Sequence, residues 1–218
     1  EIDAFVDYTG TALTVVLGES PSGGKGEVYR RVKEGYASRF GLDVLEPLGF
    51  ENTFAIVIRG ADARRLKLSK ISDIQPYARQ WRGGFGYEFA ERLDGYRGLV
   101  EKYRLRFELP PRTLDLGLLY RALIEKQVDI VAGSSTDGLL TALDLVVLED
   151  DQHYFPPYEA VPVTRPQMLA AHPEARRAFD ELAGQFSEGE MRRLNYEVDG
   201  EHKDVRAVVR EFLRSKGL

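Results

Sequence analysis

Short apolar runs alternate with amphipathic segments along the whole chain. Runs typical of β-strands occupy residues 3–6, 42–45, 54–58, 128–132 and 143–148. Apolar side chains at helical spacing predict helices over residues 27–40, 116–126 and 205–213. Because the strands alternate with helices, the sequence predicts an α/β fold with mainly parallel sheets.

Glycine and aspartate mark the ends of two predicted helices. Gly41 follows the helix predicted over 27–40 and is typical of a left-handed C-cap. Asp94 is a candidate N-cap for a further helix over 96–103. The run 54–58 contains no polar position, which predicts a strand that is buried on both faces.

Three polar or aromatic segments follow predicted strands. They are EIDAFVDYTGT at 1–11, RLDGYRGL at 92–99 and SSTDG at 134–138. Ligands of parallel α/β sheets bind beyond the carboxyl ends of the strands, which is where these segments are expected to lie. None of them carries a catalytic nucleophile or a cluster of metal ligands. The pattern therefore favours a ligand held between two lobes, and a binding protein over an enzyme.

Composition excludes several other classes of function. The formal net charge of −5 argues against a nucleic-acid backbone as partner. The chain has no cysteine, which excludes disulfides and thiolate metal sites, and its histidines stand alone at His153, His172 and His202. No apolar run approaches the roughly 20 residues of a membrane span. We expect no metal, no cofactor and no catalytic residue.

An internal echo suggests two similarly built lobes. Residues 2–5 and 128–131 share a pattern, and each is followed by a turn that contains threonine and glycine. A predicted helix precedes the second copy, whereas the first copy begins the sequence. We therefore expect that an N-terminal piece of the first lobe is missing, and that dimerisation could cover the exposed sheet edge. A chance similarity is the alternative.

Several motifs together resemble a known family. In order along almost the whole chain they lie at 1–11, 47–55, 87–95, 118–123, 135–138, 144–151 and 155–158. They resemble the substrate-binding proteins of osmoprotectant ABC importers, the glycine betaine, carnitine and choline group with the type II periplasmic-binding fold. Members of that family usually carry a further βαβ unit ahead of the position of Glu1, in agreement with the inferred truncation.

The resemblance implies a two-lobe clamp. Residues 1–52 and 158–218 would form lobe I, and residues 53–157 would form lobe II. Crossover strands join the lobes, which close on a small cation or zwitterion. Because a quaternary ammonium has no hydrogen to donate, aromatic faces bind it through cation–π attraction. An arginine suits the carboxylate at the other end of a betaine.

The resemblance also implies the ligand-binding residues. Tyr8, Phe54 and Tyr158 match aromatic positions of the cage. Ser134 stands where many family members have a further tyrosine, and this departure opens one wall of the cage. A bulkier betaine such as ergothioneine could use that space, or another aromatic side chain could fill it.

Arg92 matches the position that pairs with the ligand carboxylate, and Thr11 matches a hydroxyl that holds the same end. Each assignment has a structural alternative. A local salt bridge with Asp94 would explain Arg92, and core packing would explain Phe54. Thr136 and Asp137, which follow Ser134 in the same segment, are candidate helix caps.

The function implied is the solute-binding component of an ABC importer, with a membrane permease as its partner and no nucleic acid. Its location would be extracytoplasmic: periplasmic, anchored by lipid, or fused to the permease. The alternatives are a ligand-sensing domain of a regulator and a binding protein for a larger betaine. No Ser/His/Asp set or nucleophile elbow supports an enzyme.

Overall fold

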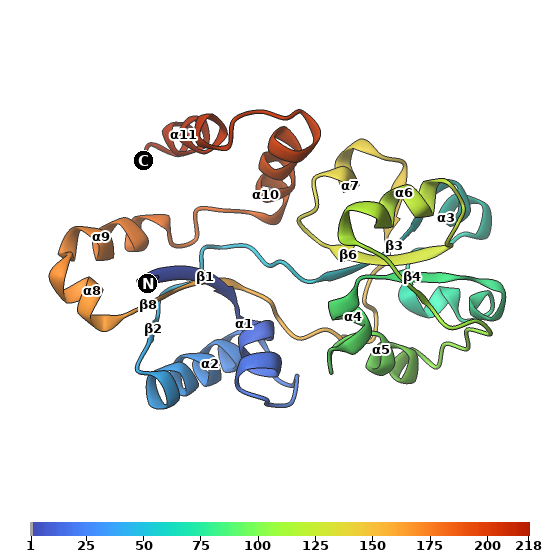
Figure 1. The fold of residues 1–218 in the computed structure, drawn as a ribbon, viewed down its shortest axis with the longest axis horizontal. Helices are drawn as coiled ribbons and strands as arrows, with labels where there is room; N and C mark the ends of the chain where they lie inside the picture. The colour runs from blue at the N-terminus through green and yellow to red at the C-terminus, as the bar shows by residue number, and fades with distance from the viewer. Residues whose placement is uncertain (1) are drawn as a thin grey trace. The chain divides into compact units, whose positions relative to one another are not determined.

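The computed structural model describes residues 2–218, so Glu1, the first residue of the N-terminal motif, lies outside the described residues. The chain divides into two compact units (Figure 1). Unit 1 comprises Glu1–Thr53 and Pro156–Leu218, and unit 2 comprises Phe54–Phe155. These bounds differ from the expected lobes by one residue at the first passage between units and by two at the second.

Unit 1 contains a three-stranded sheet in the order β1-β8-β2. Its strands are β1 (Ala4–Tyr8), β8 (Ala160–Thr164) and β2 (Asp43–Val44), and both pairs are antiparallel. Helix α2 (Lys25–Phe40) packs on this sheet and ends at Gly41, whose φ of 64° is the left-handed C-cap expected from the sequence.

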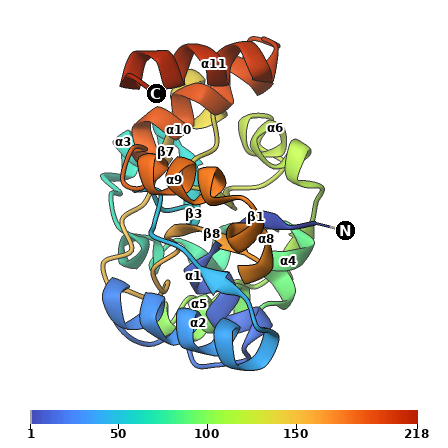
Figure 2. The same cartoon turned by 90° about the vertical axis from the view of Figure 1, so that its left-hand side faces the viewer.

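The other helical segments of unit 1 either flank this sheet or form the C-terminal part of the unit. They are α1 (Thr9–Thr11), a π-helix (Ala12–Val16), α8 (Pro166–Ala171), α9 (Pro173–Leu182), α10 (Glu188–Asn195), a second π-helix (Tyr196–Gly200) and α11 (Val205–Lys216). Helices α10 and α11 lie side by side (Figure 2) and share a small core of Leu194, Val208 and Phe212. The last helix thus extends three residues beyond the predicted range of 205–213.

Unit 2 contains a five-stranded sheet in the order β5-β4-β6-β3-β7. The strands are β3 (Phe54–Arg59), β4 (Gly83–Phe85), β5 (Arg112–Thr113), β6 (Ile130–Ser134) and β7 (Leu145–Val147). Along β3, Ile56 and Ile58 enter one core cluster, whereas Ala55 and Val57 enter another. The prediction that this strand is buried on both faces is therefore confirmed.

Helices of unit 2 supply the side chains that complete these two clusters. They are α3 (Gly60–Leu66), α4 (Tyr87–Glu91), α5 (Tyr96–Tyr103), α6 (Leu119–Ile124) and α7 (Leu139–Ala142), with 3₁₀ segments at Ile71–Ile74, Ala78–Gln80 and Leu116–Leu118. The predicted helix over 96–103 is confirmed, but its N-cap is Gly95. The prediction that Asp94 caps it is wrong, because that carboxylate is taken up by an ion pair described below.

Strand directions are mixed. Strand β4 runs parallel to β5 and β6, as the sequence predicts, whereas β3 runs antiparallel to β6 and β7. In unit 1, β8 is antiparallel to both of its neighbours. The strands β3 and β8 follow the two passages of the chain between units. Their antiparallel pairing therefore reflects how the chain enters each unit after a passage, and not the crossover of a βαβ unit.

Helix α10 begins with a capping box that also joins it to α11. Glu190 accepts hydrogen bonds from the N–H and the hydroxyl of Ser187, and Lys216 lies 2.7 Å from its other oxygen. The hydrogen bond from Lys216 is the largest cause that lowers the pKa of Glu190, from 4.5 to about 2. The stabilisation from this carboxylate is therefore complete above its unfolded pKa and lost as pH falls through its folded pKa.

We predict that Glu190→Gln lowers the free energy of unfolding by about 1 kcal/mol at neutral pH, with a smaller difference as pH falls from 4.5 towards 2. Urea unfolding at several pH values measures this difference. The control is Glu34→Gln, which removes an exposed carboxylate from α2. A destabilisation by Glu190→Gln that does not change with pH would contradict the assignment.

Candidate functional site

The six predicted ligand-binding residues fall into two sets, one in each unit. The unit 1 set is Tyr8, Thr11 and Tyr158, and the unit 2 set is Phe54, Arg92 and Ser134. Tyr8 ends β1, Phe54 begins β3 and Ser134 ends β6. Strand ends are where the sequence placed the candidate site.

In unit 1, hydrogen bonds hold the start of α1 to the segment where the chain returns from unit 2. The Thr9 hydroxyl donates to the carbonyl oxygen of Pro157 and accepts from the N–H of Glu159, both at 3.0 Å. The Thr9 N–H donates to the Glu159 carbonyl oxygen, also at 3.0 Å. These three hydrogen bonds fix residue 158 beside the segment that carries Tyr8 and Thr11.

Tyr158 is held at both its ring and its backbone. A Cβ added to Gly10 would lie 2.6 Å from two ring carbons of Tyr158, so the ring packs directly on this glycine. Its N–H donates to Glu51 at 3.1 Å, and its carbonyl accepts from the Asn52 N–H at 3.0 Å. Tyr158 is only 2% exposed, and these contacts hold its ring in a fixed position. No pattern in the sequence indicates that Glu51 accepts a hydrogen bond from the backbone of Tyr158.

Charged groups surround the backbone of Tyr158. Lys25 forms an ion pair with Glu51, and this hydrogen bond raises the pKa of the lysine. Burial is the main cause that raises the pKa of Glu159, which also lies near Glu51. Tyr8 is half-buried against the apolar cluster that contains Phe50.

In unit 2, Arg92 and Asp94 form a bidentate ion pair. The distances are 2.8 Å from Nε to Oδ1 and 2.7 Å from Nη2 to Oδ2. The Asp94 side chain is 0% exposed. The Arg92 Cζ lies 5.1 Å from the centroid of the Phe54 ring, within cation–π range. The salt bridge weighed as an alternative for Arg92 is therefore present.

Phe54 and Phe155, the first and last residues of unit 2, belong to one aromatic cluster. The Phe54 ring centroid lies 4.9 Å from that of Phe89 and 6.0 Å from that of Phe155. Phe54 thus contributes to core packing, the other alternative weighed from the sequence. Tyr154 packs against Phe155, its hydroxyl donates to the carbonyl oxygen of Gly95 at 2.8 Å, and burial raises the pKa of this tyrosine.

Ser134 is paired with Phe54 across β6 and β3. The Ser134 N–H donates to Asp137 Oδ2 at 2.9 Å, and the Tyr120 hydroxyl donates to the same oxygen at 2.5 Å. The N-cap of α7 is Gly138, without a side-chain hydrogen bond. The prediction that Asp137 caps a helix is therefore wrong: its carboxylate turns back and fixes the loop at Ser134.

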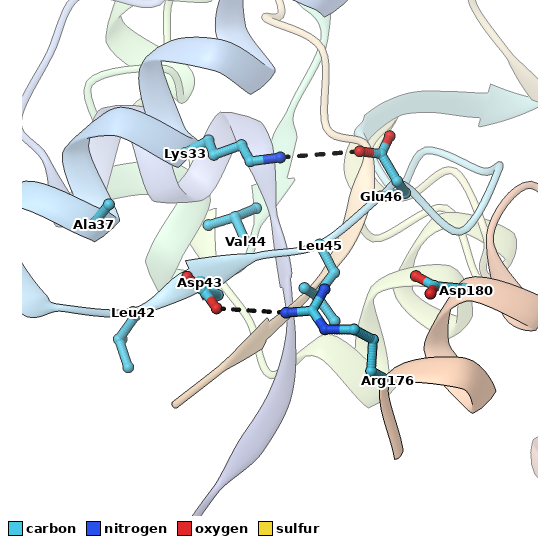
Figure 3. A pocket seen from close by; sticks show the side chains of 9 residues that line it. All are labelled: Lys33, Ala37, Leu42, Asp43, Val44, Leu45, Glu46, Arg176 and Asp180. Carbon is cyan, nitrogen blue, oxygen red and sulfur yellow. Dashed lines mark ion pairs between the residues drawn. The ribbon is translucent and has the colours of Figure 1, made fainter. Parts of the chain in front are cut away.

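Unit 1 also contains a cavity of about 300 Å³ that includes none of the six predicted residues (Figure 3). It lies between α2, β2 and α9, where Lys33 lies 3.9 Å from Glu46 and Arg176 lies 3.8 Å from Asp43. No aromatic side chain lines it. This cavity therefore lacks the faces that a quaternary ammonium requires.

Within residues 2–218, no group of three or more His, Cys, Asp or Glu side chains is placed to hold a metal ion. No helix over the same residues is both long enough and apolar enough to cross a membrane.

The family model for the substrate-binding domain of ABC-type glycine betaine transport systems, OpuAC, matches residues 1–215. The chain belongs to this family. The resemblance drawn from the sequence motifs is thereby confirmed. As a substrate-binding component of a transport system, the family is not one of enzymes.

Individual relatives agree with the family. The carnitine transport binding protein OpuCC of Listeria monocytogenes is 34% identical over 209 residues, which cover 95% of this chain and 67% of the relative. The ergothioneine transport permease/ergothioneine binding protein EgtU of Helicobacter pylori is 30% identical over 218 residues, which cover 100% of this chain and 39% of the relative.

A crystal structure of a glycine betaine/carnitine/choline ABC transporter is 35% identical, with a TM-score of 0.84. The similarity covers 98% of this chain and 78% of that one. This match confirms the α/β class and the binding-protein fold expected from the sequence.

We predict that Arg92→Met lowers the free energy of unfolding by about 3 kcal/mol, because it leaves the buried Asp94 carboxylate without its cation. Urea unfolding of Arg92→Met, Asp94→Asn and the double variant gives their coupling. The matched control is the bidentate pair of Arg64 and Asp144, which is more than 60% exposed. Arg64→Met should change the free energy of unfolding far less than Arg92→Met, because water and salt screen an exposed pair. Equal losses in the two pairs would contradict the prediction.

Proposed function

We propose that this chain is the solute-binding component of an ABC importer and captures a quaternary-ammonium compatible solute. The match of the family to residues 1–215 carries the proposal. The names of its relatives point to the solute class, because OpuCC is named for carnitine and the similar crystal structure for glycine betaine, carnitine and choline. The leading candidate ligands are therefore carnitine and glycine betaine, followed by choline.

In this proposal each unit supplies half of the ligand site, and the two units close on the solute. Tyr8 and Tyr158 of unit 1 and Phe54 of unit 2 offer aromatic faces to the trimethylammonium group. Arg92 donates to the ligand carboxylate while Asp94 holds the plane of its guanidinium, and Thr11 binds the same end of the ligand. The close packing of the Tyr158 ring on Gly10 supports this assignment, because it fixes the orientation of the ring.

The proposed partner is a membrane permease, and the proposed location is extracytoplasmic. Members of this family are substrate-binding domains of transport systems, which must meet their permease to deliver the solute. EgtU is named as permease and binding protein together, so fusion to a permease occurs in a relative. Attachment by lipid and free diffusion in a periplasm are the other arrangements.

A second candidate ligand is ergothioneine. EgtU, which is 30% identical to this chain, is named for it. Ser134 is small at the position where the resemblance expects a tyrosine, and a small side chain leaves room for the thioimidazole ring of a larger betaine. Calorimetric titration with carnitine, glycine betaine, choline and ergothioneine decides between the ligands. Absence of binding to all four would overturn the proposal.

Removal of an aromatic face should weaken ligand binding. We predict that Tyr8→Leu and Tyr158→Leu each reduce the affinity for the preferred solute at least about tenfold, because a leucine keeps apolar volume but has no π-face. The control is Phe40→Leu at the exposed end of α2, which should leave affinity within about twofold. Unchanged affinity in both tyrosine variants would contradict the cage.

The role of Arg92 can be separated from folding by comparing ligands. We predict that Arg92→Gln reduces the affinity for glycine betaine at least about tenfold and leaves choline within about twofold, because choline has no carboxylate. The ratio of the two affinities does not depend on the folded fraction of the variant. An equal loss for both ligands would show that Arg92 acts only through the structure of unit 2.

A larger side chain at residue 134 should shift ligand preference. We predict that Ser134→Tyr raises the ratio of glycine betaine affinity to ergothioneine affinity at least about tenfold, because it closes one wall of the cage. Ser134→Thr adds little volume and serves as the control. An unchanged ratio of the two affinities would show that residue 134 does not contact the ligand.

A further inference from the structure

Helix α11 has an apolar arc that is wider than the core covering it. Val208 and Phe212 are buried against Leu194 of α10. Val205 and Val209 continue the same arc along the helix but are 55% and 46% exposed. Leu213, on the other side of Val209, also packs against this core, so the exposed part of the apolar arc is Val205 and Val209.

A row of arginines borders this exposed half. Arg206, Arg210 and Arg214 recur at four-residue intervals, so they share one side of the helix. All three are exposed, and none forms an ion pair with any residue from 2 to 218. By contrast, Lys216 at the end of the same helix is paired with Glu190.

The nearby carboxylates do not neutralise this row. Asp204 caps the helix by accepting from the Ala207 N–H at 2.9 Å. Glu211 lies three residues before Arg214 and is therefore its neighbour on the helix surface, but the two side chains form no ion pair among the described residues. One carboxylate beside the row leaves it with a net positive charge. The helix thus presents a positive stripe on a chain whose formal net charge is −5.

The surface beside the arginines is shallow. A hollow of about 500 Å³ follows the helix and is lined only by residues of α11 and by Leu218. A groove for a partner helix needs a second wall, and none of its lining residues comes from another element. The 12 residues of α11 extend for about 18 Å, which gives a straight, open face.

We propose that this face of α11 docks on an anionic lipid bilayer. Guanidinium groups bind lipid phosphates with two parallel hydrogen bonds, while Val205 and Val209 contact the boundary between headgroups and acyl chains. A second copy of the chain fits less well, because pairing two such faces brings two rows of arginine together. The proposal stands on α11 alone and does not depend on the solute.

Co-sedimentation with lipid vesicles tests this proposal. The full chain is mixed with vesicles of phosphatidylcholine alone or with about 30% phosphatidylglycerol, in about 0.1 M salt. Excess glycine betaine is present, so that the choline headgroup does not compete for a solute site. The expected result is binding to the anionic vesicles alone, which weakens in about 0.5 M salt.

Two triple variants carry the same change of net charge, from −5 to −8 (−5 − 3). The test variant combines Arg206→Gln, Arg210→Gln and Arg214→Gln, and should bind anionic vesicles at least about tenfold more weakly. The control combines Arg30→Gln, Arg106→Gln and Arg177→Gln, which lie elsewhere on the surface, and should stay within about twofold.

Equal losses in the two triple variants, or no preference of the unaltered chain for anionic vesicles, would overturn the proposal. Sedimentation velocity without lipid provides a separate readout. A dimer that is lost in Val209→Ser would assign the face to a second copy of the chain instead. Solute affinity measured on the same variants should not change, so this proposal and the proposed ligand site can fail independently.

Discussion

Unit 1 depends on the hydrogen bonds of β8. This unit is built from two chain segments, 1–53 and 156–218, which are separated in sequence by all of unit 2. Strand β8 lies between β1 and β2 and pairs with both, so it joins the late segment to the early one. Closing so long a loop costs conformational entropy, which the ladder and the burial of Val161 and Val163 must offset. Without β8, the two short strands β1 and β2 would have no partner in their sheet.

The same constraint positions the candidate site. In unit 1, the hydrogen bonds of Thr9 fix the residues that follow the second passage, and Tyr158 is one of them. In unit 2, the residues at the two passages, Phe54 and Phe155, pack against each other with ring centroids 6.0 Å apart. Each unit therefore fixes its own chain ends with local contacts. Side chains at these ends are set by the packing of one unit, as a preorganised binding surface requires.

Periodicity predicted the long elements and could not predict strand direction. The helix over 96–103 and the two-faced burial of 54–58 were visible because each depends on a local pattern. Helices α3 and α4 have seven and five residues, too few for a helical period to stand out. The antiparallel pairing of β3 depends on partners distant in sequence. The hydrogen bond from the Ser134 N–H to the Asp137 carboxylate and the one from the Tyr158 N–H to Glu51 likewise have no signature in the local sequence pattern.

The pairing of Arg92 with Asp94 gives the proposed site a specific electrostatic character. A lone buried guanidinium would carry a large desolvation cost, whereas the bidentate carboxylate offsets that cost before any ligand binds. The pair is neutral overall, yet the guanidinium still presents N–H donors to an incoming carboxylate. Aromatic faces bind the quaternary ammonium without a fixed negative charge. A neutral site of this kind suits a zwitterion, because the two charges of the ligand cancel and the loaded site carries no net charge. A simple cation would leave one positive charge in the site, so the proposed site favours betaines over simple cations.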